Sequence, residues 1–312
     1  MKPMNCPHHM QIFADNQFSY RDMPIRYFEP ATVYRDEKTG QLSWLTRVRS
    51  ITQDDGHLFC RVSQITEEVW TIVQIIKEFY TTLGMIDDYW VRLSIRGPEG
   101  KYLWDDSVWE KAEWALRAAS EKYDLPYKIW VWEAAFYWPK LDFMFKDAIG
   151  REWQLATIQC DFNLPVRFDL SFTNEQGEKE RPVVIHRAIS GSLERFMWVM
   201  IEQFWGAFPL WLAPVQFQIV PVADKFNDYA FELAARLRKD DFRVKIDDST
   251  DSFSKKIRNA ELMKVPYTLI VWEKEVEWKT VSIREFRSKK QYTLKTEELV
   301  EQVMVERKER RI

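Results

Sequence analysis

The stretch that decides the fold is YFEPATVYRDEKTGQLSWLTRVRSITQDDGHLFC, residues 27–60. Its first ten residues are rich in β-branched and aromatic side chains, which favours a strand. Residues 37–46 are polar around Gly40 and predict a turn, and residues 47–60 alternate well enough to form the returning strand. The sequence therefore predicts a long antiparallel hairpin that carries many charged side chains.

Around this hairpin the sequence predicts helices and a series of strands. Apolar residues at helical spacing indicate one helix over 63–84, ended by Gly84, and another over 105–124, while a third is expected from about 190 to 205. Further strands are expected at 89–96, 127–132, 141–146, 152–162, 166–172 and 183–187. Because most of these strands follow one another without helices between them, we expect an antiparallel sheet flanked by helices.

The pattern changes near the proline-containing linker 208–216. Beyond it, strands at 216–222, 242–247, 266–272 and 277–285 are interleaved with helices at 224–238, 252–263 and 296–308. We therefore expect two domains, an α+β domain over residues 1–210 and a small α/β domain over residues 211–312.

Composition limits the functional classes. A formal net charge of −3 gives no global indication of nucleic-acid binding, although local basic patches remain compatible with it. Three cysteines, Cys6, Cys60 and Cys160, form no disulfide framework and suit a reducing compartment. With neither a signal peptide nor an apolar run long enough to span a bilayer, we expect a cytoplasmic protein without a membrane partner.

Metal-binding residues are few and far apart in the sequence. Cys6, His57 and His186 come from three distant segments and could form a three-ligand zinc site with an open fourth position, as catalytic zinc sites use. The alternative is a small core cysteine and two hydrogen-bonded core histidines.

Two patterns are suited to phosphate. Arg35 and Glu37 follow a strand, where an arginine can bind a phosphate bidentately and a glutamate can accept from an amino group. In ISGSLERF, residues 189–196, Gly191 permits close backbone approach and the following helix presents Arg195. Each pattern alone is weak, since Arg35 and Glu37 could equally be a surface ion pair.

Together, five ordered segments resemble the catalytic core of bacterial threonyl-tRNA synthetases, which are class II enzymes. The segments are MKPMNCPHHMQIF, VYRDE…LTRVRSITQDDGHLFC, AFYWPKLDF, WQLATIQCDFNLP and VVIHRAISGSLERF. The tail from about residue 213 resembles the anticodon-binding domain of the same family. This resemblance implies a class II antiparallel sheet flanked by helices, and it raises the zinc interpretation above its alternative.

The resemblance also implies residue roles in amino-acid selection. Cys6, His57 and His186 match zinc ligands, and in the family this metal binds threonine through its amino and hydroxyl groups. Asp55 matches the acceptor of the threonine hydroxyl, and Gln53 and Tyr137 match further threonine contacts. A hydrophobic pocket distinguishes valine from threonine poorly, whereas a metal that requires a hydroxyl ligand would exclude valine. The same requirement would not exclude serine, which also has a hydroxyl.

For ATP, the resemblance implies catalytic roles for Arg35 at the α-phosphate and for Arg195 as a further phosphate clamp, with Mg²⁺ on the phosphates. The full set of expected ATP-binding residues is Arg35, Glu37, Arg47, Lys140, Gln154, Thr157 and Arg195. The implied chemistry is attack of the threonine carboxylate on ATP to give threonyl-adenylate, followed by transfer to tRNA(Thr). In the tail, Lys264, Glu275 and Arg284 match anticodon-reading positions, although Lys264 stands where arginine is common and ordinary surface charge is the alternative.

The sequence also departs from the family. The first class II motif, which builds much of the dimer interface, should precede residue 1, as should the N-terminal and editing domains. We therefore expect an N-terminally truncated part of a homodimeric ligase, weakly active or inactive by itself. The alternatives are another class II enzyme, such as a prolyl-tRNA synthetase, and a synthetase-like tRNA-binding fragment without catalysis.

A second departure concerns tryptophan. The chain has 15 Trp and 9 Gly, where average usage predicts roughly 22 Gly. The family normally has Gly at nine of the Trp positions: Trp44, Trp104, Trp130, Trp132, Trp138, Trp198, Trp205, Trp272 and Trp278. Trp70 and Trp114 are possible further positions of this kind. Some bacterial lineages read the codon UGA as glycine, so these tryptophans are interpreted as glycines of the natural protein. The alternative is a genuine Trp-rich variant.

Overall fold

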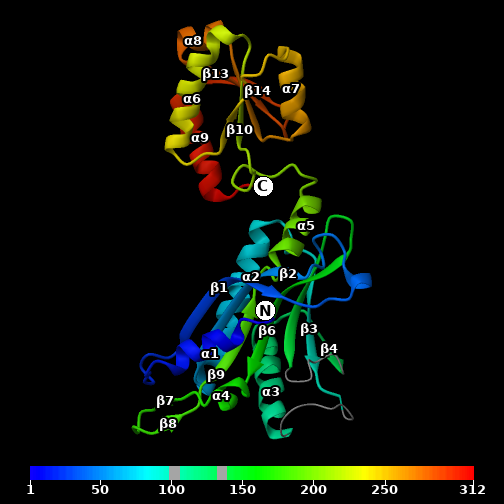
Figure 1. Cartoon of the computed structure of the whole chain (residues 1–312), viewed down its shortest axis with the longest axis vertical. Helices are drawn as coiled ribbons and strands as arrows, with labels where there is room; N and C mark the ends of the chain where they lie inside the picture. The colour runs from blue at the N-terminus through cyan, green and yellow to red at the C-terminus, as the bar shows by residue number, and fades with distance from the viewer. Residues whose placement is uncertain (98–105, 132–138) are drawn as a thin grey trace. The chain divides into compact units, whose positions relative to one another are not determined.

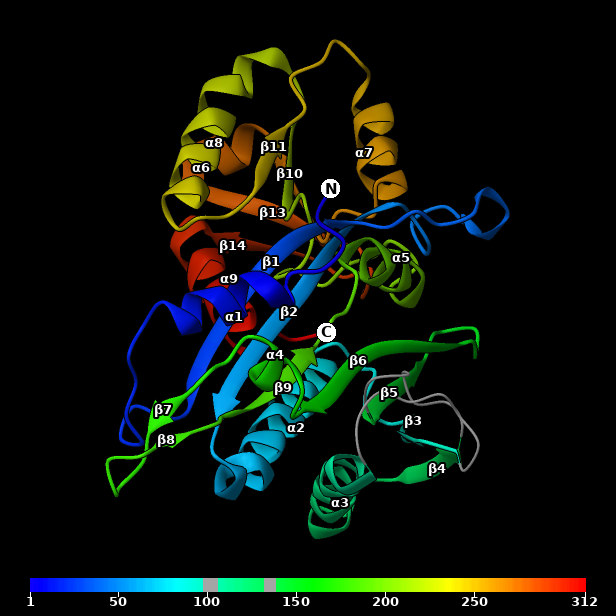
Figure 2. The same ribbon diagram turned by 60° about the horizontal axis from the view of Figure 1, so that its bottom comes forward.

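The computed structural model describes residues 1–97, 106–131 and 139–312. The chain divides into two compact units, Met1–Met200 and Ile201–Ile312, which are described separately. Each unit is built around a β-sheet with helices packed on it (Figures 1 and 2). The predicted α+β class is confirmed. Within the described residues, none of the helices combines the length and the apolar character that crossing a membrane requires.

The first unit contains a seven-stranded sheet. Its strands, in spatial order, are β1 (Ile25–Tyr34), β2 (Ser50–Cys60), β9 (Val183–Ala188), β6 (Glu152–Asp161), β5 (Lys140–Lys146), β3 (Tyr89–Ile95) and β4 (Tyr127–Val131). All neighbouring pairs are antiparallel except β3 and β4. β1 and β2 form the predicted hairpin, in register from the Ile25–Phe59 pair to the Tyr34–Ser50 pair.

Helices cover this sheet. α2 (Ile65–Thr82) packs against α3 (Asp106–Lys122), and both contact β6. The buried face of α2 includes Val69, Ile72, Val73 and Ile76, which lie at the spacing that gives a helix one apolar side. The short α1 (Cys6–Ala14) crosses in front of β1 and β2 in Figure 2, and α5 (Leu193–Gln203) follows β9. The remaining short elements are η1 (Thr39–Gln41), η2 (Val62–Gln64), α4 (Leu164–Arg167), β7 (Phe172–Thr173) and β8 (Lys179–Glu180).

Two differences from the predicted elements concern this unit. The strand predicted at 166–172 is wrong, because the chain forms α4 there and only Phe172 enters a strand. Oδ1 of Asp161 accepts the backbone N–H groups of Asn163 and Leu164 at 2.7 and 2.9 Å, and Pro165 suits the first turn of a helix.

The helix α1 was not expected from the sequence. It is nine residues long, and its N-terminal end includes Pro7. Met10 and Phe13 of this helix are buried in a cluster with Phe59 of β2. Packing rather than length therefore stabilises it, because isolated helices this short are marginal in water.

The second unit has a mixed five-stranded sheet. Its order is β11 (Val244–Ile246), β10 (Phe217–Pro221), β12 (Tyr267–Val271), β13 (Thr280–Glu285) and β14 (Gln291–Lys295). β10 pairs in parallel with β11 and β12, whereas β12–β13 and β13–β14 are antiparallel. The accompanying helices are η3 (Asp224–Phe226), α6 (Asn227–Lys239), α7 (Phe253–Leu262), α8 (Glu273–Trp278) and α9 (Thr296–Glu309).

The second unit also corrects two sequence-based expectations. The strand predicted at 277–285 begins only at Thr280, because residues 273–278 form α8. A side-chain oxygen of Glu275 accepts the N–H of Trp272 at 3.1 Å, which satisfies one free donor at the start of that helix. The strand β14 was not predicted, although QYTLK alternates polar and apolar residues and its positions alternate between exposed and half-buried; the segment is only five residues long.

The tryptophans in question occupy several backbone environments. Trp44 and Trp205 have φ angles of +39° and +51°, in the left-handed region that favours glycine. The others within the described residues lie in regular elements or at a helix start: Trp130 in β4, Trp198 in α5, Trp278 in α8 and Trp272 directly before α8. Trp104, Trp132 and Trp138 lie outside the described residues. The glycine interpretation stays a prediction, and the backbone supports it at Trp44 and Trp205.

Candidate functional site

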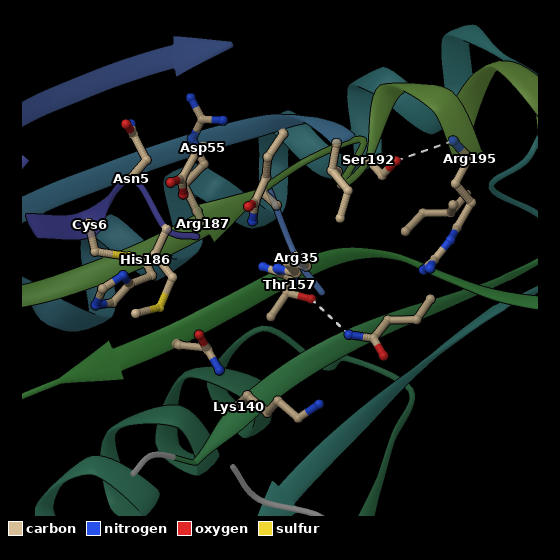
Figure 3. Close-up of a pocket in the computed structure, with 18 residues that line it drawn as sticks. Asn5, Cys6, Arg35, Asp55, Lys140, Thr157, His186, Arg187, Ser192 and Arg195 are labelled. Atoms are coloured by element: carbon tan, nitrogen blue, oxygen red, sulfur yellow. Dashed lines mark hydrogen bonds between the residues drawn. The ribbon is translucent and has the colours of Figure 1, made fainter. Parts of the chain in front are cut away.

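A cavity of about 460 Å³ opens in the first unit (Figure 3). Its floor is formed by β2, β9, β6 and β5, and the start of the chain and the turn before α5 complete it. The lining residues are Met4, Asn5, Cys6, Arg35, Ile51, Gln53, Asp55, Lys140, Gln154, Leu155, Thr157, Gln159, His186, Arg187, Ala188, Gly191, Ser192 and Arg195. Sequence segments from residue 4 to residue 195 therefore meet in one hollow, and most of the predicted site residues lie there.

Cys6 and His186 line the cavity, and the fully buried His57 lies against them. The candidate ligand atoms of these three side chains all lie within 4.8 Å of one another. Strand pairing explains this arrangement, because His57 of β2 lies directly opposite His186 of β9, and α1 begins at Cys6. His57 is fully buried, and its Nε2 has no hydrogen-bond partner among the described residues. A buried nitrogen with a free lone pair, a second imidazole and a thiol fit a zinc ion.

Charge is distributed unevenly around this cluster. Burial, with help from the neighbouring His186 and His9, lowers the pKa of His57 and keeps that ring neutral. Burial also acts to lower the pKa of His186, but Cys6 and Asp161 outweigh it and raise the pKa to about 10. The Asp161 carboxylate beside His186 therefore favours positive charge there, either as a proton on the ring or as a cation bound in its place.

Asp55 lines the cavity beside the histidine cluster. Its Oδ1 lies 3.8 Å from Nε2 of His57, and burial raises the pKa of its carboxyl to about 6. A carboxyl at this place can accept a hydrogen bond from a hydroxyl of a ligand held beside the histidines.

The opposite end of the cavity carries guanidinium groups. Arg35 and Arg195 both line it, and Nε of Arg195 donates to the carbonyl oxygen of Thr46 at 3.0 Å. Burial, together with nearby Arg47 and Arg35, lowers the pKa of Arg195. Such mutual repulsion is relieved when an anion binds between the groups, so this end suits a phosphate.

Arg47 and Glu37 do not line the cavity. Their side chains form an ion pair with each other at 2.9 Å beside it. The surface ion pair that the sequence left open as an alternative for Glu37 is thus present in the structure, with Arg47 rather than Arg35 as the partner.

A buried carboxylate that was not predicted as a site residue contacts three of the residues predicted to bind ATP. Asp142 of β5 is fully buried and accepts hydrogen bonds from Gln154 at 2.7 Å and Thr157 at 3.0 Å. It also pairs with Lys140 at 2.6 Å and Arg92 at 3.1 Å. Lys140, Gln154 and Thr157, all predicted to bind ATP, therefore share one anchor. Alternation along β5, which places Lys140 and Asp142 on one face, was the available indication.

A side chain of β2, Asp54, holds the turn that precedes α5. Oδ2 of Asp54 accepts the backbone N–H groups of Ile189 and Ser190, both at 2.8 Å, and its Oδ1 pairs with Arg187 at 2.7 Å. Gly191 has a φ of +70°, and a Cβ there would lie 2.7 Å from the carbonyl oxygen of Leu155. The backbone at Gly191 therefore lies close to that of Leu155, and the approach of a phosphate to Gly191 stays a prediction.

The remaining predicted residues lie elsewhere. Tyr137 is outside the described residues. Lys264, Glu275 and Arg284 belong to the second unit, where each has a partner inside that unit: the Trp205 carbonyl for Lys264, Ser282 for Glu275 and Glu261 for Arg284. Their predicted contact with an anticodon stays a prediction.

Comparison with known families matches both units. The family described as tRNA synthetase class II core domain (G, H, P, S and T) matches residues 1–204. The family described as anticodon binding domain matches residues 216–306.

Curated relatives are similar across most of the chain. The threonine–tRNA ligase of Deinococcus deserti is 50% identical over 286 residues, covering 91% of this chain and 44% of the relative. That of Thermus thermophilus is 46% identical over 313 residues, covering 100% of this chain and 47% of the relative. The chain thus spans less than half the length of these relatives.

Two solved structures are similar in fold. A crystal structure titled as the RNA binding domain of threonyl-tRNA synthetase from Cryptosporidium parvum Iowa II has a TM-score of 0.92 and 37% identity, covering 97% of this chain and 75% of that one. A putative threonyl-tRNA synthetase from Aeropyrum pernix has a TM-score of 0.81 and 32% identity, covering 99% and 74%. The chain therefore belongs to the threonyl-tRNA synthetase family of class II tRNA synthetases.

Proposed function

We propose that this chain is the catalytic and anticodon-binding part of a threonine–tRNA ligase. The observation that carries the proposal is the cavity itself, where the Cys6–His57–His186 cluster and Asp55 lie at one end and Arg35 and Arg195 at the other. An amino acid with a side-chain hydroxyl suits the first end, and the α-phosphate of ATP suits the second. The proposed reaction joins them as threonyl-adenylate.

The chain's own residues supply binding and charge stabilisation in this proposal. Arg35 and Arg195 bind the α-phosphate and stabilise the negative charge that develops when the threonine carboxylate attacks it, while pyrophosphate leaves. Neither acts as a covalent nucleophile. Lys140, Gln154 and Thr157, held by Asp142, orient the nucleotide, and Mg²⁺ accompanies the phosphates.

Threonine selection is proposed to use zinc held by Cys6, His57 and His186. When bound, zinc would supply a Lewis-acidic centre that takes the amino and hydroxyl groups of threonine as ligands. Asp55 accepts a hydrogen bond from the same hydroxyl, and Gln53 lines the cavity two residues before it. A buried carboxylate that accepts from a substrate hydroxyl is left without its partner when valine binds instead.

For the second unit we propose tRNA(Thr) anticodon binding, which the family match over residues 216–306 supports. Transfer of the threonyl group to the terminal ribose of tRNA(Thr) completes the reaction. We extend the proposal to a homodimer for the whole protein.

The test compares two stable adenylate analogues, threonyl- and valyl-sulfamoyl adenosine, by titration calorimetry on zinc-loaded chain. The threonyl compound is expected to bind about 10⁴-fold more tightly, the size of discrimination that buried polar partners provide. In Cys6→Ala the preference for the threonyl compound should shrink, because the cluster has lost a ligand and only Asp55 still favours a hydroxyl. Equal binding in the parent chain, or preference for a prolyl analogue, would contradict the proposal.

A further inference from the structure

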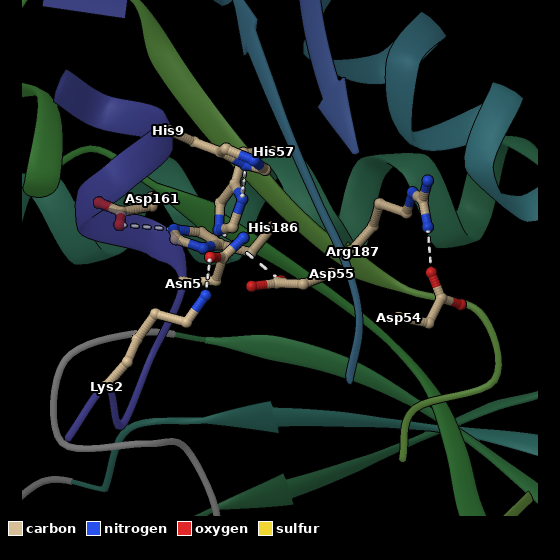
Figure 4. A network of polar contacts seen from close by, with 9 residues as sticks. All are labelled: Lys2, Asn5, His9, Asp54, Asp55, His57, Asp161, His186 and Arg187. Atoms are coloured by element: carbon tan, nitrogen blue, oxygen red, sulfur yellow. Dashed lines mark hydrogen bonds and ion pairs between the residues drawn. The ribbon is translucent and has the colours of Figure 1, made fainter. Parts of the chain in front are cut away.

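In each of the two histidines of the cluster, one ring nitrogen is hydrogen-bonded to a residue outside the cluster. The Nδ1 of His57 lies 2.7 Å from Nδ1 of His9, and Nε2 of His186 lies 2.8 Å from Oδ2 of Asp161 (Figure 4). The nitrogens left for a ligand are therefore Nε2 of His57 and Nδ1 of His186. His9 and Asp161 are outside the three-residue cluster and were not among the predicted site residues.

Asp161 determines where His186 carries its proton. Its carboxylate is fully buried, and its Oδ1 already accepts the backbone N–H groups of Asn163 and Leu164. An ionised carboxylate only accepts hydrogen bonds, so His186 must donate through Nε2–H. The lone pair of a neutral His186 then lies on Nδ1, on the side of the ring away from Asp161.

His9 performs the same task for His57 by a different route. Two Nδ1 atoms at 2.7 Å share one proton, so one ring donates and the other accepts. Nε2 of His57 is buried without a partner among the described residues, which suits a lone pair aimed into the cluster. His57 then carries its proton on Nδ1 and donates it, while His9 accepts. His9 is itself buried and lies on α1, the helix that begins at Cys6.

We propose that Asp161 and His9 are positioning residues that select the tautomers of His186 and His57 required for metal binding. The inference rests on the proposed zinc site and adds two residues to it. Hydrogen bonds of this kind orient the ligand rings and raise their basicity, and their loss typically lowers metal affinity by about 10–100-fold.

The sharpest variant is Asp161→Asn. Its amide oxygen can still accept the backbone N–H groups of Asn163 and Leu164, so the local turn is retained. Its NH₂ group then faces Nε2 of His186 and can only donate, which forces the proton of that ring onto Nδ1 and removes the lone pair from the cluster.

For His9, two variants separate shape from hydrogen bonding. His9→Phe keeps a ring of similar size but offers no acceptor to His57. His9→Asn places an amide oxygen near the position of Nδ1 and should restore the acceptor.

Asp147→Asn is the matched control. Asp147 is also a buried carboxylate that accepts two backbone N–H groups, those of Ile149 and Arg151, and one ring N–H, that of Trp153; it differs in a further ion pair with the Arg151 guanidinium at 2.8 Å. It lies between β5 and β6 and is not part of the cluster. Its replacement tests whether loss of a turn-stabilising carboxylate is by itself enough to weaken the metal site.

The experiment measures zinc affinity of the whole chain by competition with a chromophoric chelator, with the Co²⁺ absorption spectrum as a second readout. Asp161→Asn and His9→Phe are expected to bind zinc about 10–100-fold more weakly and to alter the Co²⁺ spectrum. His9→Asn and Asp147→Asn should remain close to the parent. Parent-like affinity in both Asp161→Asn and His9→Phe would overturn the inference, and parent-like affinity in one would remove that residue from it.

The Cys6→Ala variant tests the zinc site itself, independently of the positioning residues. If the parent binds zinc and Cys6→Ala does not, the proposed site holds and the positioning variants decide the inference. If the parent binds zinc no better than Cys6→Ala, the proposed zinc site fails, and the inference fails with it.

Discussion

Replacing Trp205 by Gly is expected to stabilise the second unit. The backbone at Trp205 has a φ of +51°, and 68% of the residue's surface is exposed. For residues other than Gly, the left-handed conformation costs about 1–2 kcal/mol, because Cβ approaches the following carbonyl oxygen. A side chain this exposed contributes little burial that would be lost on its removal.

The gain is partly offset in the unfolded chain. Gly has more conformations to lose on folding, which costs about 0.5–1 kcal/mol. At the midpoints of these ranges the net increase in the free energy of unfolding is about 0.75 kcal/mol, or roughly 3–6 °C in melting temperature for a unit of this size. The carbonyl of Trp205 that accepts from Lys264 belongs to the backbone, so the substitution leaves it in place.

Calorimetry of the whole chain, with Trp114→Gly as the matched variant, measures this effect. Trp114 is similarly exposed, at 69%, but it lies inside α3, where Gly is less favourable than Ala by about 1 kcal/mol. Trp205→Gly should raise the melting temperature, and Trp114→Gly should lower it. If both variants melt lower than the parent, the backbone argument for glycine at Trp205 is refuted.

Three further perturbations have definite expected outcomes. Gly191→Ala should lower the free energy of unfolding by at least about 2 kcal/mol, measured by urea titration, because a positive φ and a Cβ only 2.7 Å from a carbonyl oxygen act together; a neutral effect would contradict the turn geometry. Asp142→Asn should lower it by about 3–5 kcal/mol, since Lys140 loses a buried partner, and should raise the KM for ATP in pyrophosphate exchange; an unchanged KM would exclude the anchoring role. Burial raises the pKa of Glu306 above its ordinary 4.5, so the stability it contributes is present below pH 4.5 and is lost as pH rises through the raised pKa. Glu306→Gln should therefore flatten the pH dependence of the melting temperature above pH 4.5, and an unchanged slope would assign that dependence to other groups.

Much of the fold was accessible from sequence because its strongest patterns are local. The hairpin of residues 27–60 follows from composition and alternation, and the helix α2 follows from apolar residues at helical spacing. The strand predicted at 166–172 failed for a reason that is also local, since the Asp161 side chain satisfies the backbone of a short helix there. Helix α1 depends on burial against β2, which no sequence window contains.

The site was accessible only in part, because cross-strand register is not a property of any single segment. His57 and His186 meet because β2 and β9 pair in one particular register. Asp142 and Asp161 are buried acids at or near strand ends, and without the structure each reads as an ordinary polar residue. Their importance follows from what lies opposite them, namely Lys140 for Asp142 and His186 for Asp161.

β2 combines two functions by alternation alone. Its residues Asp55 and His57 face the cavity and the histidine cluster, while Asp54 points to the other side and holds the turn before α5 through Ser190. At Gly56 a Cβ would lie 2.6 Å from Nε of Arg187, so glycine there leaves room for the side chain that pairs with Asp54. Because side chains alternate with a period of two, a slip of one residue in β2 would exchange the two carboxylates and destroy both arrangements. The sequence DDGH therefore needs its exact strand register for function as well as for packing.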